Sequence, residues 1–432
     1  MPHTPLENAP APARESAGPM SDKAVLLALF EAALSAALPE GKFKDRLPVP
    51  PKGRTIVIGA GKASARMARA FEEEWDRPCE GLVVTRYGHG CETRQIEIVE
   101  AAHPVPDAAR REAAGRILEL ARSAGPDDLV VCLMSGGASA LLTLPAEGLT
   151  LEDKQALNRA LLKSGAPIGI MNKVRKSVSA IKGGRLARAI QPARAVTYLI
   201  SDVPGDDPAA IGSGPTIPEA SDAESVLALL KAYAVDIPPH VEAVIRTNGV
   251  PGDAIPGQEV HMIATPLMAL EAAAEKARVL GLVPLILGDA IEGAAREAGI
   301  VFAGIGQCTA RHGLPAKAPC VLLSGGETTV TVRGKGRGGR SVEYLLSLAI
   351  ALKGERGVSA ISCDTDGVDG TEDNAGAWFD DRILEEAAAK GLKPGNFLAN
   401  NDGYSFFSAL DRLVITGPTL TNVNDFRALL VR

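Results

Sequence analysis

The stretch that decides the fold is IVIGAGKASARMA, residues 56–68, in which an apolar run ends in a glycine turn and leads into a helical pattern. Further apolar runs of this kind alternate with helical patterns, at residues 82–85, 96–101, 129–134 and 195–201. Continuous apolar strands separated by helices are typical of a parallel sheet with both faces covered. We therefore predict a doubly wound, Rossmann-like α/β domain in the N-terminal half.

A second α/β domain is expected after a linker. The chain has 432 residues, which is more than one hydrophobic core usually serves. Prolines and glycines between residues 238 and 257 interrupt the pattern, and apolar runs then return at 260–264, 282–287, 320–323, 328–332 and 358–362. We predict a disordered tail at 1–20, a Rossmann-like domain at 21–240 and a smaller α/β domain at 258–432.

Composition restricts the class of partner. The formal net charge of −6 argues against nucleic-acid or anionic-membrane binding, which needs a basic face. The six cysteines form no CxxC pair, so neither a zinc site nor a disulfide framework is indicated. No apolar run approaches the ~20 residues of a membrane span. We expect a cytoplasmic protein that binds small molecules, with monomer and homodimer both open.

The turn after the first strand contains Gly59, Gly61 and Lys62, and Ser64 then opens the helix. The turn is a weak dinucleotide fingerprint, because Ser64 takes the third glycine position, and it is too short for a Walker A loop. A lysine at a turn is most often a solvated charge. At a glycine-rich helix start, where backbone amides attract anions, Lys62 is nevertheless a candidate for phosphate binding.

Two later strand ends share a Ser-Gly-Gly turn. The segments VVCLMSGGASALL (residues 130–142) and VLLSGGETTV (residues 321–330) supply Ser135, Gly136, Gly137, Ser324, Gly325, Gly326 and Glu327. Each turn alone could simply require a positive φ. Their joint occurrence predicts two backbone cradles for anions, one in each domain and both facing a shared cleft.

Charged side chains follow in the N-terminal half. The segment NKVRKSVSAIKGGRLA, residues 172–187, contains Arg175 and Lys176, which form either a solvated helix face or a site for a carboxylate or phosphate. The segment LISDVPGDDPAAIGSGPT, residues 199–216, places Asp202 and Ser213 after a strand. A carboxylate at a strand end can bind Mg²⁺ or accept a hydroxyl proton, so Asp202 is a candidate for both roles.

The C-terminal half contains the strongest local signal for phosphate. In RGKGRGGRSVEYLLSLA, residues 333–349, Gly338, Gly339 and Arg340 lead into a helix, although a flexible hairpin is the alternative. In SCDTDGVDGTEDNAGA, residues 362–377, Asp364 and Asp366 lie among glycines. The spacing lacks the terminal glutamate of an EF-hand, so these carboxylates fit magnesium in a nucleotide site better than calcium, unless they only shape turns.

Taken in order, these motifs resemble those of the glycerate 2-kinase family, which joins a DUF4147-type domain to a MOFRL domain. The resemblance covers nearly the whole chain after the tail and rests on GAGKAS, SGGASALL, VRKSVSAIKGGRLA, SDVPGDDPAAIGSGPT, LSGGETTV, GRGGRSVEY, DTDGVDG and TGPTLTNVNDF. It implies an active site in the cleft between the domains, with Lys62 and Arg340 as the catalytic residues. The implied reaction is Mg²⁺-dependent transfer of the γ-phosphoryl group of ATP to the 2-hydroxyl of D-glycerate, giving 2-phosphoglycerate and ADP. One position departs from the pattern, because Ser177 stands where many members have histidine.

Two other function classes compete with this interpretation. Some members of the family are labelled hydroxypyruvate reductase, which would be an NAD(P)-dependent enzyme needing a full dinucleotide loop and a histidine paired with a carboxylate. His89 and His103 lie in suitable loops, but no carboxylate partner is evident in the sequence. A non-catalytic sensor of nucleotides or sugar acids would keep the glycine turns without needing Lys62 and Arg340 together. We also expect both cations to be exposed, so that removing either leaves folding stability nearly unchanged.

Overall fold

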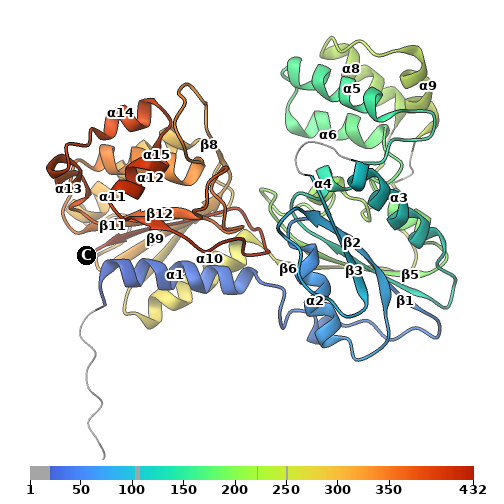
Figure 1. The fold of residues 1–432 in the computed structure, drawn as a ribbon, viewed down its shortest axis with the longest axis horizontal. Helices are drawn as coiled ribbons and strands as arrows, with labels where there is room; N and C mark the ends of the chain where they lie inside the picture. Colours follow the sequence, from blue (N-terminus) through green and yellow to red (C-terminus); the bar gives the residue numbers. More distant parts are fainter. Residues whose placement is uncertain (1–19, 103–107, 221, 250–251) are drawn as a thin grey trace, which may run out of the picture.

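The computed structural model describes residues 20–102, 108–220, 222–249 and 252–432. Figure 1 shows two lobes, each built on a sheet, and a group of helices above the first lobe. Almost all of the predicted tail, residues 1–19, lies outside the described residues, as does His103. In the part of the chain that is described, no helix is long and apolar enough to cross a membrane.

The first lobe contains a six-stranded sheet in the order β3-β2-β1-β4-β5-β6, with every pair parallel. Its strands are β1 (Thr55–Ala60), β2 (Glu80–Arg86), β3 (Ile96–Ala101), β4 (Leu129–Met134), β5 (Arg194–Ile200) and β6 (Gln258–Ala264). This is the strand order of the doubly wound dinucleotide-binding fold, so the predicted fold class is confirmed. The order reverses between β1 and β4, where such sheets bind ligands.

Both faces of the first sheet are covered, as the continuous apolar strands predict. On one face, Val57 of β1 packs in a core with α2 (Ser64–Glu74). On the other face, Ile56 and Ile58 pack with α3 (Ala108–Arg122), α4 (Ala138–Leu141) and α7 (Arg185–Ile190). The alternation of these side chains between the two cores is the period-2 geometry of a strand.

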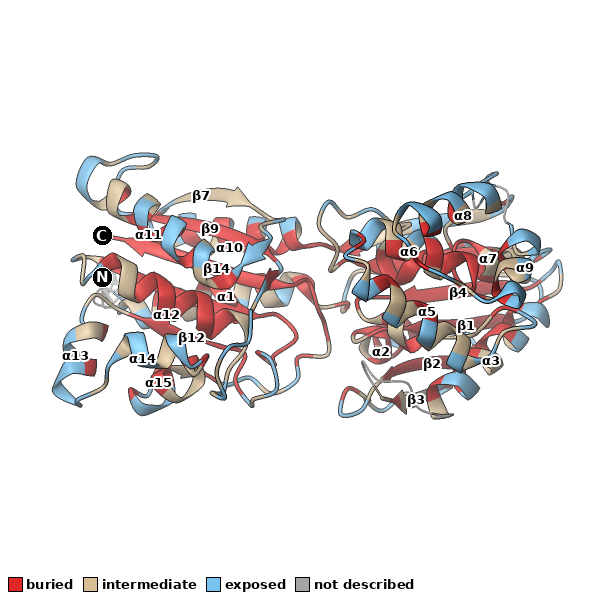
Figure 2. Cartoon of the chain, turned by 90° about the horizontal axis from the view of Figure 1, so that it is seen from above, coloured by how far each residue is buried: buried red, intermediate tan, exposed pale blue. Residues whose placement is uncertain are grey.

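Four helices form a unit with a core of its own, which the sequence did not predict. They are α5 (Leu151–Lys163), α6 (Ile168–Ser177), α8 (Ala223–Ala232) and α9 (Pro239–Thr247). Their buried residues, including Leu157, Val174, Leu230 and Ile245, form a cluster separate from both sheet cores. Figure 1 shows this helical unit above the sheet of the first lobe, on the side of α4, and Figure 2 looks down on it.

The second lobe contains a six-stranded mixed sheet in the order β13-β12-β11-β14-β9-β7. Its strands are β7 (Val283–Gly288), β9 (Cys320–Gly326), β11 (Val358–Asp364), β12 (Gly376–Phe379), β13 (Leu413–Val414) and β14 (Asp425–Val431). Only β7 and β9 pair in parallel among them. A separate two-stranded sheet joins β8 (Gly293–Ala294) to β10 (Thr328–Thr329).

Helices cover both faces of the second sheet. One face packs against α1 (Asp22–Ala37) and α10 (Pro266–Val279), and the other packs against α11 (Ala295–His312) and α12 (Arg340–Leu352). Three short helices, α13 (Ile383–Ala389), α14 (Pro394–Ala399) and α15 (Gly403–Ala409), complete this lobe. Phe426 and Leu430 of β14 face α1, whereas Leu429 faces the α12 side, so the strand is apolar on both faces.

Two elements lie in the lobe opposite to the predicted one. Strand β6, expected to open the second domain, pairs with β5 and completes the first sheet. Helix α1, expected in the first domain, packs on α10 and β14 of the second lobe. Both differences have the same cause, because the apolar pattern of a segment shows that it must be covered but not which lobe covers it.

Candidate active site

The site is built at the point where the strand order of the first sheet reverses, between the β1–α2 loop and the β4–α4 loop. Gly59 lies against Leu133, where a Cβ atom would meet the carbonyl oxygen at 2.3 Å. Gly61 has a φ of 138°, and a Cβ atom there would meet Ser135 Oγ at 2.1 Å. These glycines therefore allow the two loops to pack closely.

The contacts between the two loops fix the direction of Lys62. Its backbone N–H donates to the Gly136 carbonyl at 2.8 Å. The next amide, that of Ala63, donates to Ser135 Oγ at 3.0 Å. Ser135 is fully buried, and its hydroxyl oxygen holds the amide directly before α2, so Ser135 and Gly136 together fix the backbone at Lys62.

The Lys62 ammonium group pairs with the acidic loop of the second lobe. Its Nζ lies 2.5 Å from Asp366 Oδ2, and Arg86 Nη1 lies 3.9 Å from the same oxygen. The Asp366 backbone N–H donates to Asp364 Oδ1 at 3.1 Å, which places the two carboxylates side by side. Burial opposes the charge of Lys62, but Asp366 and Asp364 outweigh it and raise the lysine pKa.

The two neighbouring carboxylates have opposite pKa shifts. Burial, together with the adjacent Asp366, raises the pKa of Asp364 well above its usual range. Burial would also raise the pKa of Asp366, but the Lys62 ammonium outweighs it and lowers that pKa. Asp366 is therefore the charged partner of Lys62, whereas the charge on Asp364 is costly unless a cation compensates for it.

Arg340, at the start of α12, binds three carboxylates. Its Nε lies 2.6 Å from Asp425 Oδ1, its Nη2 lies 2.8 Å from Asp364 Oδ2, and its Nη1 lies 2.8 Å from Glu327 Oε1. Burial opposes the guanidinium charge, but these carboxylates raise the pKa of Arg340. The Arg340 and Lys62 side chains are 21% and 16% exposed, so the expectation of exposed cations is wrong for both residues.

Asp202, after β5, connects the first lobe to the C-terminal segment. Its Oδ2 accepts a hydrogen bond from Asn422 Nδ2 at 3.1 Å, and its carbonyl accepts one from Asn424 Nδ2 at 2.5 Å. A Cβ atom on Gly136 would meet Asp202 Oδ2 at 1.9 Å, so any side chain there would displace the Asp202 carboxylate. Burial raises the pKa of Asp202 to about 6, although Lys62 counteracts the shift.

The structure thus brings together Lys62 and Asp202 from the first lobe and Arg340, Asp364 and Asp366 from the second. A lysine, an arginine and several carboxylates from both sheets meet at the junction of the lobes. The charges are held by contacts within the protein, so their positions are set before a substrate arrives. Such fixed charges are suited to stabilising a transition state in which negative charge develops.

The glycine-rich loop before α12 does not present a free helix start to phosphate, contrary to the prediction. Asp369 Oδ1 and Oδ2 accept from the backbone N–H groups of Ser341 at 2.9 Å and Val342 at 3.0 Å. A Cβ atom on Gly339 would meet Asp369 Oδ1 at 2.2 Å, and Gly338 has a φ of 130°. Both glycines therefore allow the loop to pack on the Asp364–Asp369 turn.

The second Ser-Gly-Gly turn is also occupied by protein. The Gly325 carbonyl accepts from the Ile291 N–H at 3.1 Å, and a Cβ atom on Gly326 would meet that nitrogen at 2.2 Å. Ser324 is fully buried in β9. Of this motif, Glu327 is the member that contacts the site, through Arg340.

Three other predicted residues lie away from this junction. Arg175 lines a cavity between the β4–α4 loop and the helical unit. Lys176 forms an ion pair with Glu219 and lines a different cavity. Ser213 forms a hydrogen bond with Ser139 at 2.6 Å between the hydroxyl oxygens.

Sequence reasoning missed the residues of TNVND, 421–425, that support the site. Asp425 binds Arg340 and also Arg427, whose Nη2 lies 2.5 Å from Asp425 Oδ2. Asn422 and Asn424 hold Asp202. A signal was present in the sequence, because the polar residues Asn422, Asn424 and Asp425 stand at the start of a buried strand. Their partners are far away in sequence, so the sequence did not indicate what they bind.

Among the described residues, no three His, Cys, Asp or Glu side chains form a ready metal site. His89 is buried near the junction, and neither ring nitrogen has a hydrogen-bond partner within the described residues. Burial and the nearby Arg86 lower the pKa of His89 to about 4. Its imidazole is therefore neutral at physiological pH.

Comparison with known proteins gives two family matches. Residues 25–246 match the model described as a domain of unknown function, DUF4147, and residues 320–425 match the MOFRL family. A protein of Agrobacterium vitis, provisionally named a hydroxypyruvate reductase, is 50% identical over 416 residues, covering 95% of each chain. The D-glycerate 2-kinase of Thermotoga maritima is 39% identical over 409 residues, covering 94% of this chain and 98% of that protein. The crystal structure of a glycerate kinase from Thermotoga maritima is similar with a TM-score of 0.88 at 38% identity, covering 95% of this chain and 99% of that chain.

Proposed function

The chain belongs to the family that joins a DUF4147 domain to a MOFRL domain, and we propose that it is a glycerate 2-kinase. It transfers the γ-phosphoryl group of ATP to the 2-hydroxyl of D-glycerate and releases 2-phosphoglycerate and ADP. The observation that carries the proposal is the pairing of Lys62 with the acidic loop that also binds Arg340. We further propose that the enzyme is cytoplasmic.

The fixed cations suit phosphoryl transfer. The transferred group spreads negative charge over its equatorial oxygens, so catalysis depends mainly on positioned charges and not on a protein nucleophile. The ammonium group of Lys62 provides a compact positive charge from the first lobe. The guanidinium group of Arg340, from the second lobe, is planar and can donate two parallel hydrogen bonds to one anion. Asp202, whose pKa is raised to about 6 by burial, is the candidate acceptor for the proton of the 2-hydroxyl.

The acidic loop fits Mg²⁺. Asp364 lies beside Asp366 and Asp425, and the resulting repulsion in a buried place is what a divalent cation relieves. Mg²⁺ usually takes one or two carboxylates and completes its shell with water and substrate phosphates, so a cage of three protein ligands is unnecessary. We propose Asp364 and Asp366 as the carboxylates that hold it. When bound, the ion neutralises charge on the phosphates of ATP.

Replacing Asp366 by asparagine is expected to raise the Mg²⁺ concentration needed for half-maximal rate by at least about tenfold, because the amide cannot supply a charged ligand. The amide oxygen can still accept from the Val368 N–H, as Asp366 Oδ1 does at 2.9 Å, so the turn keeps its shape. The measurement is initial rate against Mg²⁺ concentration. Asp373→Asn, at an exposed position of the same loop, is the matched control. An unchanged Mg²⁺ dependence for Asp366→Asn would remove this residue from the metal site.

The function itself is tested by ADP release. The purified protein is expected to form ADP from ATP only when both Mg²⁺ and D-glycerate are present. Phosphorus NMR of the product distinguishes 2-phosphoglycerate from 3-phosphoglycerate. Formation of the 3-isomer would keep the kinase and correct the position of transfer, whereas no glycerate-dependent ADP release would reject the kinase.

A second candidate function rests on the Agrobacterium vitis relatives, provisionally named hydroxypyruvate reductases, which are 50% and 52% identical to this chain. The site disfavours that reaction. A dinucleotide pyrophosphate would bind at the start of α2, but there Lys62 pairs with Asp366, which places the acidic loop of the second lobe against this turn. His89 has no carboxylate partner and is neutral above about pH 4. Oxidation of NADH or NADPH by hydroxypyruvate, without ADP release from ATP and glycerate, would favour the reductase.

A further inference from the structure

A second site lies on the other side of the β4–α4 loop. Between this loop and helices α5 and α6 is a cavity of about 680 Å³. Gly137 of the loop and Ser139 of α4 line it, while Gly136 of the same loop lies against Asp202. The loop therefore borders both the cavity and the lobe junction.

The cavity is lined by cations from four segments of the chain. They are Arg110 of α3, Lys154 and Arg159 of α5, Arg175 of α6 and Lys182 from the turn that follows. Among the described residues that line the cavity, there is no aspartate or glutamate. Such a one-sided set is unexpected in a chain whose formal net charge is −6.

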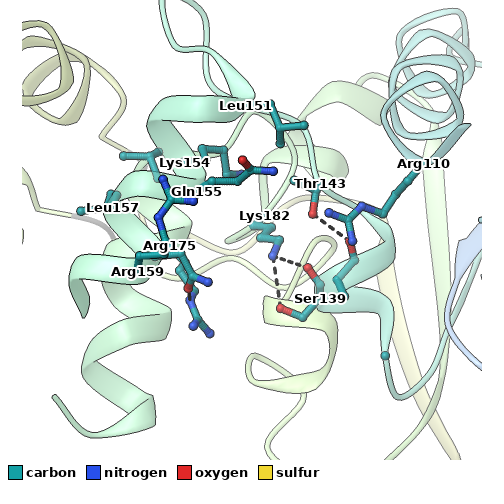
Figure 3. A pocket seen from close by; sticks show the side chains of 14 residues that line it. Arg110, Ser139, Thr143, Leu151, Lys154, Gln155, Leu157, Arg159, Arg175 and Lys182 are labelled. Carbon is teal, nitrogen blue, oxygen red and sulfur yellow. Dashed lines mark hydrogen bonds between the residues drawn. The ribbon is translucent and has the colours of Figure 1, made fainter. Parts of the chain in front are cut away.

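The hydrogen bonds of Lys182, Lys154 and Arg175 within the described residues go to neutral groups. Lys182 is 5% exposed, and its Nζ donates to the carbonyl and hydroxyl oxygens of Ser139 at 2.6 and 3.1 Å (Figure 3). Lys154 Nζ donates to the Leu144 carbonyl at 3.3 Å. The Arg175 guanidinium donates to the amide oxygen of Asn158 at 2.8 Å. By contrast, Lys176 on the same helix as Arg175 has a carboxylate partner, Glu219.

This arrangement is costly for the folded protein. Burial, together with the neighbouring cations, lowers the pKa of Lys182 well below its usual range and that of Lys154 to about 7. A buried cation without a counter-charge loses hydration and gains little in return. A site that gives up stability in this way is typically one that a ligand completes.

We infer that this cavity binds the α- and β-phosphates of the nucleoside triphosphate, whose γ-phosphoryl group then extends past Gly137 to the lobe junction. The inference deepens the proposed function and rests on it. A polyphosphate presents several negative charges along its length and matches cations that converge from several helices. D-glycerate has a single carboxylate and would leave most of these cations and most of the cavity unused. The aliphatic side chains of Leu151, Leu157 and Val178 line the same cavity and offer an apolar surface to the nucleoside.

The experiment measures binding to the full chain by isothermal titration calorimetry, with ADP, inorganic tripolyphosphate and D-glycerate as separate probes. Lys182→Met is expected to weaken both ADP and tripolyphosphate by about 30-fold or more, because it removes the buried charge that contacts the anion. It is also expected to raise the unfolding temperature of the ligand-free protein, because methionine has a similar length and needs no hydration. Binding of D-glycerate should not change.

Two further variants make the test specific. Arg175→Gln should also weaken ADP binding, since the glutamine amide can still bond to Asn158 but has no charge. Lys173→Met removes one positive charge from the same helix at an exposed position outside this cavity, and it should leave ADP binding unchanged.

Several results would overturn the inference. ADP binding to Lys182→Met with wild-type affinity would exclude the cavity as the nucleotide site. Loss of D-glycerate binding alone would assign the cavity to the acceptor. Binding of tripolyphosphate without ADP would indicate a phosphate site unrelated to the nucleotide, and a lower unfolding temperature for Lys182→Met would make Lys182 a structural residue. Failure of the proposed function is a separate result, namely no glycerate-dependent ADP release by the wild-type protein.

Discussion

Replacing Lys62 by alanine is expected to lower kcat by at least about 100-fold, which is the effect of removing one fixed charge that stabilises a transition state. The ammonium group is held at the lobe junction by Asp366, with its Nζ 2.5 Å from the carboxylate. Charge on the transferred phosphoryl group develops mainly in the transition state, so KM should change less than kcat. Steady-state kinetics with ATP and D-glycerate measures both parameters.

Loss of activity must be separated from loss of structure. Without the ammonium group, Asp366 is left as a buried carboxylate, so Lys62→Ala alone is also expected to be less stable. The double variant with Asp366→Asn should recover stability and remain inactive. Lys52→Ala, at an exposed position before the same strand, should behave like the wild type. A Lys62→Ala enzyme with near-normal kcat would show that the lysine only bridges the lobes.

Arg340→Ala is expected to have two large effects at once. It should lower kcat by about 100-fold or more, and it should destabilise folding by about 3 kcal/mol. The second effect follows because Asp364 and Asp425, which are both buried, lose their guanidinium partner. The sequence led us to expect that the stability of this variant would be close to that of the wild type, and the structure replaces that expectation with a loss of about 3 kcal/mol. Thermal or urea unfolding measures it alongside the kinetics.

Arg340→Lys distinguishes geometry from charge. An ammonium group keeps the charge but cannot contact Asp364, Asp425 and Glu327 together, so it should recover part of the stability and little of the activity. Arg337→Ala serves as the control, because this arginine lies three positions earlier and its side chain is 58% exposed. Full activity in Arg340→Lys would mean that a single positive charge is sufficient and that the shape of the guanidinium group has no catalytic role.

Much of the first sheet could be predicted because its central strands, β1 and β4, are continuous buried runs. Lys62, Asp202, Arg340, Asp364 and Asp366 could also be predicted, since each follows a strand or begins a helix, where backbone geometry exposes side chains to ligands. Local patterns could not show which loops pack on each other. That is why glycines expected to bind anions instead allow loops to approach, and why Asp369 occupies the start of α12.

The supporting residues were beyond sequence reasoning for a related reason. Asp425 contacts Arg340 across 85 positions of sequence, and Asn422 contacts Asp202 across 220 positions. Nothing in the local pattern of either residue specifies these partners. The helical unit was missed because its four helices come from two separate stretches that enclose β5, so their common core exists only in three dimensions.

The position of α1 limits how this protein can be divided or recombined. The helix is encoded before the first lobe but covers α10 and β14 of the second, and β6 is encoded after the linker but completes the first sheet. A cut in the gene at the linker would remove α1, one of the two helices on one face of the C-terminal sheet, and would remove an edge strand from the N-terminal sheet. The MOFRL match ends at residue 425, where β14 begins, so that segment alone is not a transferable module. We therefore expect the two lobes to be inherited and exchanged together, as a single unit that runs from α1 to β14.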